Sequence, residues 1–384
     1  MARRNLKRVL GGLLVSAAFV GLLSLPLAAR LAGVPPAEVE NRPLAEAPPL
    51  QSEDVLEPNY LDGTWGTFLQ DQLAFREWAL HARALVSLHL FGESTSPRVL
   101  VGEEGFLFYD QEIDRGCTEK IAPAEQLVAN ARVWADYFRS KGGELLLVIV
   151  PDKAMVYRDK LTPGQLQRYA CVDRKNEAVR AGLAAIESLA LIDLYAELKA
   201  EAGRSPEPIY FRTDTHWKWR HSLTMVERIL EHLKPGLFDP ADIVPIDSQA
   251  QTDLALMLGL SKRVTVTEFE AERPGVELDV VFPSDSVPRV ARGRGPPGTD
   301  FAEPAIFLAD SFFNRSRAAL EPYMAELVHL RLEEIQSPDA AAAIRRSRSF
   351  IVEVAMRNVY ELFTEGLTPE TLERVTARQE ALQP

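Results

Sequence analysis

Two apolar runs constrain the fold of this chain more than any other feature of its sequence. Residues 145–150 read Leu-Leu-Leu-Val-Ile-Val, and residues 305–309 read Ala-Ile-Phe-Leu-Ala. A strand that is apolar on both faces is buried on both faces, which is typical of a parallel sheet covered by helices. The sequence therefore predicts a parallel core to which both runs contribute.

Helices and further strands alternate around these two runs. Strands are expected at 144–150, 189–193, 305–309 and 350–354 and around Tyr210, and helices at 124–141, 174–188 and 217–233. Such alternation predicts an α/β fold with a mostly parallel sheet and helices on both faces.

Other segments give weaker signals. Apolar residues recur at helical spacing over 65–88, and a Gly-bearing hairpin is expected at 99–109. A helix is expected through Tyr323 to Leu327. The stretch between Leu233 and residue 305 has no clear period and is expected to be irregular.

Net charge limits the partners of the chain. The 384 residues carry a formal net charge of −12, which argues against nucleic-acid binding. A polyanionic substrate would be repelled at long range and would need a locally basic groove. Two groups of arginines are candidates for such a groove, with a solvated surface as the favoured alternative: Arg289, Arg292 and Arg294, or Arg315 and Arg317.

The N-terminus has the pattern of an export signal. Four basic residues among the first eight precede an uncharged run from Val9 to Ala29, and such residues keep that end in the cytoplasm. The run is longer than the ~7–15 apolar residues of a cleaved signal core. An uncleaved membrane anchor over 1–31 is therefore favoured, with a cleaved signal peptide as the alternative.

The rest of the chain divides by composition. Residues 32–60 are rich in Pro, Ala and Glu and are expected to form an extended tether. The folded domain is expected over 61–366, followed by a C-terminal helix and tail over 367–384.

The chain has two cysteines, Cys117 and Cys171. No metal-type cysteine spacing exists, which excludes a zinc-thiolate site. An exported chain would pair them in a disulfide, and two unrelated buried thiols are the alternative.

Residues suited to acyl transfer follow two of the expected strands. Asp214 and His216 lie two residues apart, so the carboxylate can fix the tautomer of the imidazole. Ser311 comes shortly after the run at 305–309. Ligands of open α/β sheets bind outside the carboxyl ends of the strands. The sequence therefore predicts a Ser-His-Asp site at this edge, since the order of the three residues along the chain is free.

Structural roles are the alternative interpretation of these residues. His216 alone would be a structural histidine holding a turn, and Ser311 would be a helix N-cap. A metal site from Asp193, Asp214 and His216 suits the residue types, but no spacing requires it. His221, five residues beyond His216, is expected at the surface.

Seven motifs in one order resemble a known family. They are Asn41-Arg42, Asp71 with Phe75-Arg76, Val101-Gly-Glu-Glu-Gly-Phe-Leu-Phe-Tyr109, Val150-Pro-Asp-Lys153, Thr213-Asp-Thr-His-Trp217, Asp253-Leu-Ala-Leu-Met-Leu-Gly259 and Asp310-Ser-Phe312. Together they are similar to the SGNH-hydrolase-like O-acetyltransferases of bacterial exopolysaccharide systems, the AlgJ/AlgX type. The chain ends without room for a carbohydrate-binding module, so it is nearer the AlgJ type.

The resemblance implies a fold and three roles. The fold is SGNH-hydrolase-like (flavodoxin-like), with a circularly permuted motif order in which the Asp-His pair precedes the serine. Ser311 would be the nucleophile, His216 its general base and Asp214 the residue that orients His216. Backbone N–H groups of Ser311 and Gly259 would stabilise the oxyanion. The family usually has Gly where Ala309 stands, which would perturb the oxyanion geometry if that residue needed a positive φ.

Substrate and partners follow from the same resemblance. The protein would move an acetyl group through a serine ester onto hydroxyls of an alginate-like exopolysaccharide in the periplasm. Sugar contacts are expected from Trp217, Tyr210, Arg212 and Arg315. No nucleotide, acyl-CoA or metal signature exists, so no cofactor is expected, and the donor would be an AlgI-like membrane-bound O-acyltransferase at the inner membrane. A polysaccharide acetylesterase and a non-catalytic binding subunit are the alternatives.

Overall fold

The computed structural model describes residues 2–36, 44–48, 63, 65–118, 120–260, 263–281 and 289–377. The chain forms two compact units. The first contains residues 1–99 and 253–262, and the second contains 100–252 and 263–384. This division differs from the expected boundaries, because residues 61–99 and 253–262 separate from the rest of the predicted domain.

The first unit is helical. It contains α1 (Ala2–Leu31), α2 (Gly66–Gln72), α3 (Arg76–Val86), the π-helix η3 (Ser87–Phe91) and α10 (Asp253–Met257). The helix expected over 65–88 breaks between α2 and α3 at Phe75, whose φ is 66°. In the part of the chain that the structure describes, no helix has both the length and the apolar character needed to cross a membrane. Most of the predicted tether lies outside the described residues.

The second unit is built on a seven-stranded sheet. Its strands lie in the order β4 (Leu189–Asp193), β3 (Glu144–Val150), β11 (Ser349–Ala355), β9 (Ala305–Ala309), β10 (Leu327–Leu330), β8 (Arg289–Arg294) and β7 (Glu277–Val280). The first five run parallel, and β8 pairs antiparallel with both β10 and β7. Every residue of β9 and β11 is buried. The predicted α/β fold with a mostly parallel sheet is confirmed.

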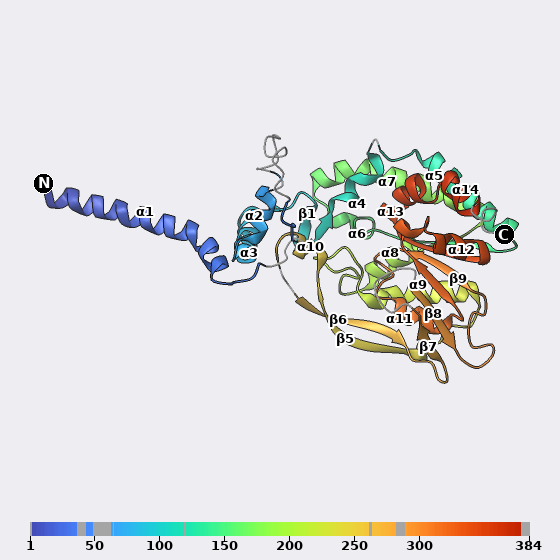
Figure 1. Cartoon of the computed structure of the whole chain (residues 1–384). Helices are drawn as coiled ribbons and strands as arrows, with labels where there is room; N and C mark the ends of the chain where they lie inside the picture. The colour runs from blue at the N-terminus through green and yellow to red at the C-terminus, as the bar shows by residue number, and fades with distance from the viewer. Residues whose placement is uncertain are drawn as a thin grey trace. The chain divides into compact units, whose positions relative to one another are not determined.

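Helices cover both faces of this sheet (Figure 1). One layer contains α5 (Ala124–Ser140), α7 (Pro163–Ala184), α12 (Pro338–Arg346) and α14 (Pro369–Ala377), in which α5 packs on α7 and α14 packs on α5 and α12. The opposite layer contains α8 (Tyr195–Arg204), α9 (Ser222–Leu233) and α11 (Arg317–Leu320). Connections between parallel strands are right-handed, so the direction of each connection across the sheet decides which face its helix covers. The connections β3→β4 and β10→β11 run in one direction across the sheet, and β9→β10 runs in the opposite direction. Since α14 belongs to this packing, it is part of the domain.

The parallel strands have a recognisable neighbour order. The five parallel strands can be renumbered 1 to 5 in the order β9, β10, β11, β3 and β4. Read across the sheet from β10 to β4, their order is then 2-1-3-4-5. This is the order of flavodoxin-like sheets. The nucleophile candidate Ser311 then follows the first strand, and Asp214 and His216 come after the last.

Several expected elements differ in the structure. The stretch around Tyr210 is a tight turn in which only Tyr210 and Trp217 form a bridge. The helix expected at 323–327 is absent, and the strand β10 begins at Leu327. Between Leu233 and residue 305 the chain forms a long antiparallel pair, β5 (Ile243–Gln251) with β6 (Arg263–Ala271), besides β7 and β8. These strands are half-exposed and polar, so their period is weak.

Candidate active site

A tight turn over residues 209–218 carries the predicted base. Phe211 N–H donates to the carbonyl of His216 at 3.2 Å, and Lys218 N–H donates to that of Ile209 at 2.7 Å. The tip of the turn is stabilised by Asp214, because its Oδ1 accepts from the backbone N–H of His216 at 2.9 Å. The turn therefore presents the Asp214 and His216 side chains together.

Asp214, His216 and Ser311 form a hydrogen-bonded chain. Asp214 Oδ1 lies 2.7 Å from His216 Nδ1, and His216 Nε2 lies 2.9 Å from Ser311 Oγ. A carboxylate only accepts hydrogen bonds, so the ring proton lies on Nδ1 and Nε2 is left to accept from the serine. Asp214 is buried, whereas Ser311 is exposed. This arrangement places a nucleophile, a base and an orienting carboxylate in sequence.

The imidazole is held between aromatic rings. Its ring centre lies 4.7 Å from that of Phe312 and 5.7 Å from that of Trp219. Phe312 is fully buried and also packs on Trp217. Apolar packing therefore fixes the plane of the ring on two sides.

The turn that carries Ser311 begins at the end of β9. Asp310 anchors it by accepting three hydrogen bonds. Its Oδ1 accepts from Phe312 N–H at 2.9 Å, and its Oδ2 accepts from Ala355 N–H and Asn358 Nδ2 at 2.8 Å each. These contacts tie the serine turn to the end of β11 and to α13 (Met356–Glu361).

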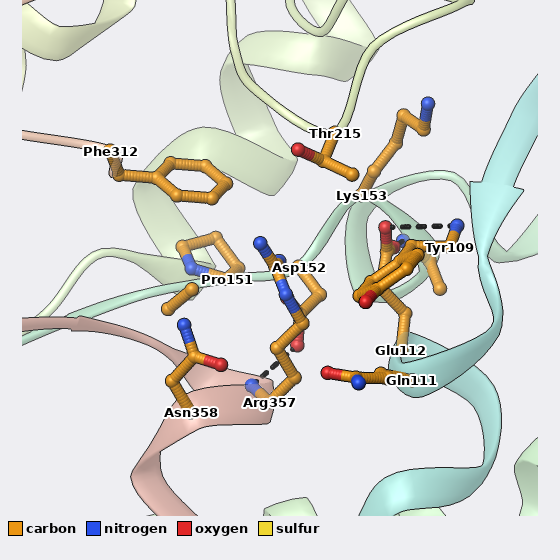
Figure 2. A network of polar contacts seen from close by, with 12 residues as sticks. Tyr109, Gln111, Glu112, Pro151, Asp152, Lys153, Thr215, Phe312, Arg357 and Asn358 are labelled. Atoms are coloured by element: carbon orange, nitrogen blue, oxygen red, sulfur yellow. Dashed lines mark hydrogen bonds and ion pairs between the residues drawn. The ribbon is translucent and has the colours of Figure 1, made fainter. Parts of the chain in front are cut away.

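Lys153 stabilises the turn that carries His216. It is fully buried in α6 (Lys153–Val156), directly after β3. Its ammonium donates to the backbone carbonyl of Asp214 at 2.6 Å and to those of Phe211 and Arg212 at 3.3 Å each. Figure 2 shows the Lys153 side chain beside Thr215. The ammonium therefore holds three carbonyls of the base-bearing turn around one point.

Lys153 is part of a buried cluster of four charged residues, with Glu112, Asp152 and Arg357 (Figure 2). Asp152 accepts from the backbone N–H of Arg357 at 2.7 Å and pairs with its guanidinium. Glu112, in α4 (Asp110–Asp114), accepts from the backbone N–H of Ala154 at 2.9 Å. Two cations and two carboxyl groups therefore balance one another beneath the site.

Burial and charge pull the pKa values of this cluster in opposite directions. Burial raises the pKa of Asp152 to about 7, and the Arg357 guanidinium opposes that rise. Burial also raises the pKa of Glu112, against Arg357 and Lys153. For Arg357, burial lowers the pKa, but Asp152 and Glu112 outweigh it and the net shift is upward. Arg357 remains a cation, with its guanidinium 5.3 Å from the ring centre of Phe312.

A donor for an oxyanion is present at the serine. Among the described residues the backbone N–H of Ser311 donates to no protein acceptor, whereas that of Phe312 is engaged by Asp310. Ala309 is the last residue of β9 and pairs with Glu353 in the parallel ladder, and its φ is not positive. Alanine fits this extended backbone without strain. Gly259 lies in the first unit with a φ of 79°, and its predicted oxyanion role stays a prediction.

Two predicted sugar contacts are wrong and two remain. Trp217 and Tyr210 are fully buried, where Trp217 packs on Phe312 and the Tyr210 hydroxyl donates to the carbonyl of Pro151. Neither ring is available to a substrate. Arg212 and Arg315 are exposed, and the Arg315 guanidinium lies 5.7 Å from the ring centre of Trp219 while pairing with Glu268.

Four other residues singled out in the sequence have structural partners. Cys117 and Cys171 form a disulfide that joins η5 (Arg115–Cys117) to α7. Asp193 pairs with Arg180 at 2.6 Å. His221, which was expected at the surface, is buried against Glu201 at 2.8 Å, and burial lowers its pKa.

Sequence reasoning missed the roles of Lys153, Asp152, Arg357 and Glu112. A signal existed for the first two, because they come shortly after the apolar run at 145–150, at the edge where sites form. Charged residues in that position are buried and need partners. Glu112 and Arg357 had no local signal, since only the fold brings them there.

The comparisons with known proteins bear on this part of the chain. Residues 99–259 match the family of the SGNH hydrolase-like domain, acetyltransferase AlgX. Over these residues the chain is similar to this acetyltransferase family, which confirms the resemblance predicted from the motifs. The matched residues include Asp214, His216 and Lys153.

A curated relative gives a second match. The chain is 32% identical over 141 residues to the probable alginate O-acetylase AlgJ of Pseudomonas putida. The aligned stretch covers 35% of this chain and 33% of that relative. The chain thus matches about a third of the length of the relative.

Solved structures show a shared fold. Bacillus cereus PatB1 with a sulfonyl adduct is similar over 70% of this chain and 97% of that chain, with 15% identity and a TM-score of 0.52. The match to the O-acetyltransferase domain of Pseudomonas putida AlgJ covers 73% of this chain and 99% of that domain's chain, with 19% identity and a TM-score of 0.44. The PatB1 match supports the α/β fold with a parallel central sheet.

Proposed function

We propose that this protein is an O-acetyltransferase that forms an acetyl ester on Ser311 and passes the acetyl group to a hydroxyl of an exopolysaccharide. The observation that carries the proposal is the hydrogen-bonded chain from Asp214 through His216 to Ser311. Its position at the carboxyl edge of a parallel sheet and the acetyltransferase family of residues 99–259 support it. The strand order supports a circular permutation of the SGNH-type fold, with the serine after the first strand of the unpermuted order.

The reaction has two steps. Ser311 Oγ attacks the acetyl carbonyl of the donor while His216 Nε2 takes the hydroxyl proton, and that proton leaves with the donor's leaving group. In the second step a sugar hydroxyl attacks the serine ester. His216 then takes the sugar proton and returns it to Ser311 Oγ. The backbone N–H of Ser311 stabilises the oxyanion in both steps.

Location and donor belong to the same proposal. The basic N-terminus and the uncharged run after it support an export signal, either retained as an anchor in the inner membrane or cleaved, with the catalytic unit in the periplasm. Acetyl donors of the cytoplasm do not reach that compartment. A membrane-bound O-acyltransferase partner of the AlgI kind would therefore supply the acetyl group.

An acetylesterase is the second candidate. It uses the same three residues, and only the group that resolves the serine ester differs. The observation in its favour is the exposure of Ser311 in a pocket with many polar lining residues. The extended backbone at Ala309 removes the reason for preferring a non-catalytic subunit.

Acyl-enzyme formation tests the proposal. The full chain in detergent is mixed with 4-nitrophenyl acetate, and release of nitrophenolate is followed together with intact mass. We expect a burst and a single acetyl adduct in the wild type, and neither in Ser311→Ala or His216→Ala. Faster loss of the adduct on addition of oligosaccharide, with acetyl recovered on the sugar, selects the transferase. Unchanged loss to water selects the esterase, and a wild type that is as inert as both variants contradicts either enzyme.

A further inference from the structure

The pocket that contains Ser311 has an acidic lining. It has a volume of about 640 Å³ and lies between the ends of β9, β10 and β11 and the segments that follow them. Its charged lining residues are five carboxyl groups and one guanidinium: Asp310, Glu333, Glu353, Glu361, Glu365 and Arg331. This pocket is the space next to the nucleophile that a sugar would occupy.

The carboxyl groups of this pocket outnumber the cations near them. Glu361 pairs with Arg115, and Asp310 is engaged by backbone and amide donors. Burial raises the pKa of Glu353 well above its usual range, and the Asp310 charge adds to the rise, which favours the neutral form. Glu333 and Glu365 are exposed and form no ion pair with any described residue. Arg331 lines the same pocket, and the charge of Arg115 also acts on Glu365.

Four of the five arginines that might form a basic groove are paired with carboxylates. Each of four candidates pairs with a carboxylate: Arg289 with Glu321 at 2.8 Å, Arg292 with Glu326 at 2.9 Å, Arg294 with Asp279 at 3.1 Å, and Arg315 with Glu268. A second pocket, beyond Asn314, is lined by four carboxylates and four arginines. Neither of these two pockets therefore offers a net positive field to a polyanion.

We infer that the acceptor at this site is a glycan whose sugar rings carry no carboxylate, so that a polyuronate such as alginate is a poor acceptor. This inference rests on the proposed function. A uronate held against Ser311 would place its charge near Glu333 and Glu365, and like charges within a pocket repel over several ångströms. A neutral sugar instead meets carboxylate and amide oxygens that accept hydrogen bonds from its hydroxyls.

A matched pair of acceptors isolates the charge. Mannuronate oligosaccharides are compared with the same oligosaccharides after reduction of their carboxyl groups, using the full chain loaded from 4-nitrophenyl acetate. We expect acetyl transfer to the reduced form to be roughly tenfold faster or more at low salt, since one such factor needs only ~1.4 kcal/mol. The difference should shrink in 0.5 M NaCl, because salt screens exposed charges.

Charge variants locate the effect. The double variant Glu333→Gln and Glu365→Gln should raise the ratio of transfer to the uronate form over transfer to the reduced form about fivefold or more. Glu373→Gln makes a similar change on α14, outside the pocket lining, and should leave this ratio unchanged.

The outcomes separate this inference from the proposed function. The adduct on Ser311 is measured before any acceptor is added, so its absence overturns the function and this inference with it. An adduct that passes to both acceptors at equal rates, at low and high salt, overturns the inference alone. Binding of the two oligosaccharides to the inactive Ser311→Ala variant gives the same comparison without transfer, and tighter binding of the uronate form would also overturn it.

Discussion

The two turns that meet at the site are held by different physical means. The turn that carries His216 depends on a buried ammonium, because Lys153 Nζ gathers the carbonyls of Phe211, Arg212 and Asp214. The turn that carries Ser311 extends the central strand β9 and is fixed by hydrogen bonds to Asp310. One half of the site thus rests on buried charge, and the other rests on the sheet.

This difference has a consequence for stability. A buried cation that loses its partners, or partners that lose their cation, are strongly unfavourable in a low-dielectric interior. A turn at the end of a buried parallel strand inherits its position from many small apolar contacts. The base-bearing turn should therefore be the half of the site that single substitutions disturb most.

Lys153→Met should have the largest effect. It leaves three carbonyls and the buried carboxyl group of Glu112 without the ammonium, which should cost about 3–5 kcal/mol of unfolding free energy. In the molecules that remain folded, the shifted His216 should slow acylation of Ser311 by about a hundredfold. Urea unfolding and the burst rate measure the two effects.

Lys160→Met is the matched control. Lys160 pairs with Asp159 and Glu104 near the surface, so both quantities should stay near those of the wild type. A Lys153→Met chain that keeps the wild-type burst rate would show that the buried cluster does not position the base.

Loss of the disulfide should rank second. Cys117–Cys171 closes a loop with a sequence separation of 54 and fixes α7 near α4, which carries Glu112. The double variant Cys117→Ser and Cys171→Ser should lose about 2–4 kcal/mol. The loss is measured by urea unfolding of the variant, compared with the oxidised wild type and with the reduced wild type. Equal midpoints for all three would contradict the prediction.

Asp310→Asn should have a smaller effect on the serine side. The amide nitrogen would face the N–H of Ala355 or the amide of Asn358 in place of an accepting oxygen, at about 1–3 kcal/mol. Acylation should slow by less than in Lys153→Met, because β9 still positions Ser311. Asp339→Asn, an exposed change in the first turn of α12, serves as the control. A larger loss of acylation than in Lys153→Met would reverse the ranking of the two turns.

Glu353→Gln should change how the unfolding free energy depends on pH more than it changes the magnitude of that free energy. Because the folded-state pKa of Glu353 is raised above the usual 4.5, the folded chain keeps a proton that the unfolded chain loses. The wild type therefore loses stability as pH rises above about 4.5. Glutamine has no such proton, so the variant should gain relative to the wild type at pH 8 compared with pH 5. A constant difference between the two across this range would contradict the assignment.

The parts of the fold that the sequence predicted well are those buried on both faces. β3 and β4 match their predicted ranges, and β9 and β11 match within one residue at each end, because continuous apolar runs leave few alternatives. The strands β5 to β8 were missed since they are partly solvated and carry charges on their exposed face. β10 was missed because its four residues follow a turn rich in helix-forming residues.

The site was predicted in the same uneven way. Asp214, His216 and Ser311 were found because each lies in a short motif, and the structure brings all three within hydrogen-bonding distance. Trp217 and Tyr210 were misread as sugar contacts, since residue type alone does not reveal burial. The cluster of Glu112, Asp152, Lys153 and Arg357 depends on contacts between segments far apart in the chain, which no local pattern contains.

Mapping the covalent adduct tests the central claim most directly. The full chain is exposed briefly to 4-nitrophenyl acetate, digested, and analysed by peptide mass spectrometry beside His216→Ala. The account predicts one acetylated position, Ser311, in the wild type, and loss of that label in the variant. Acetyl groups on another residue, or equal labelling of Ser311 without His216, would contradict the proposed roles of both.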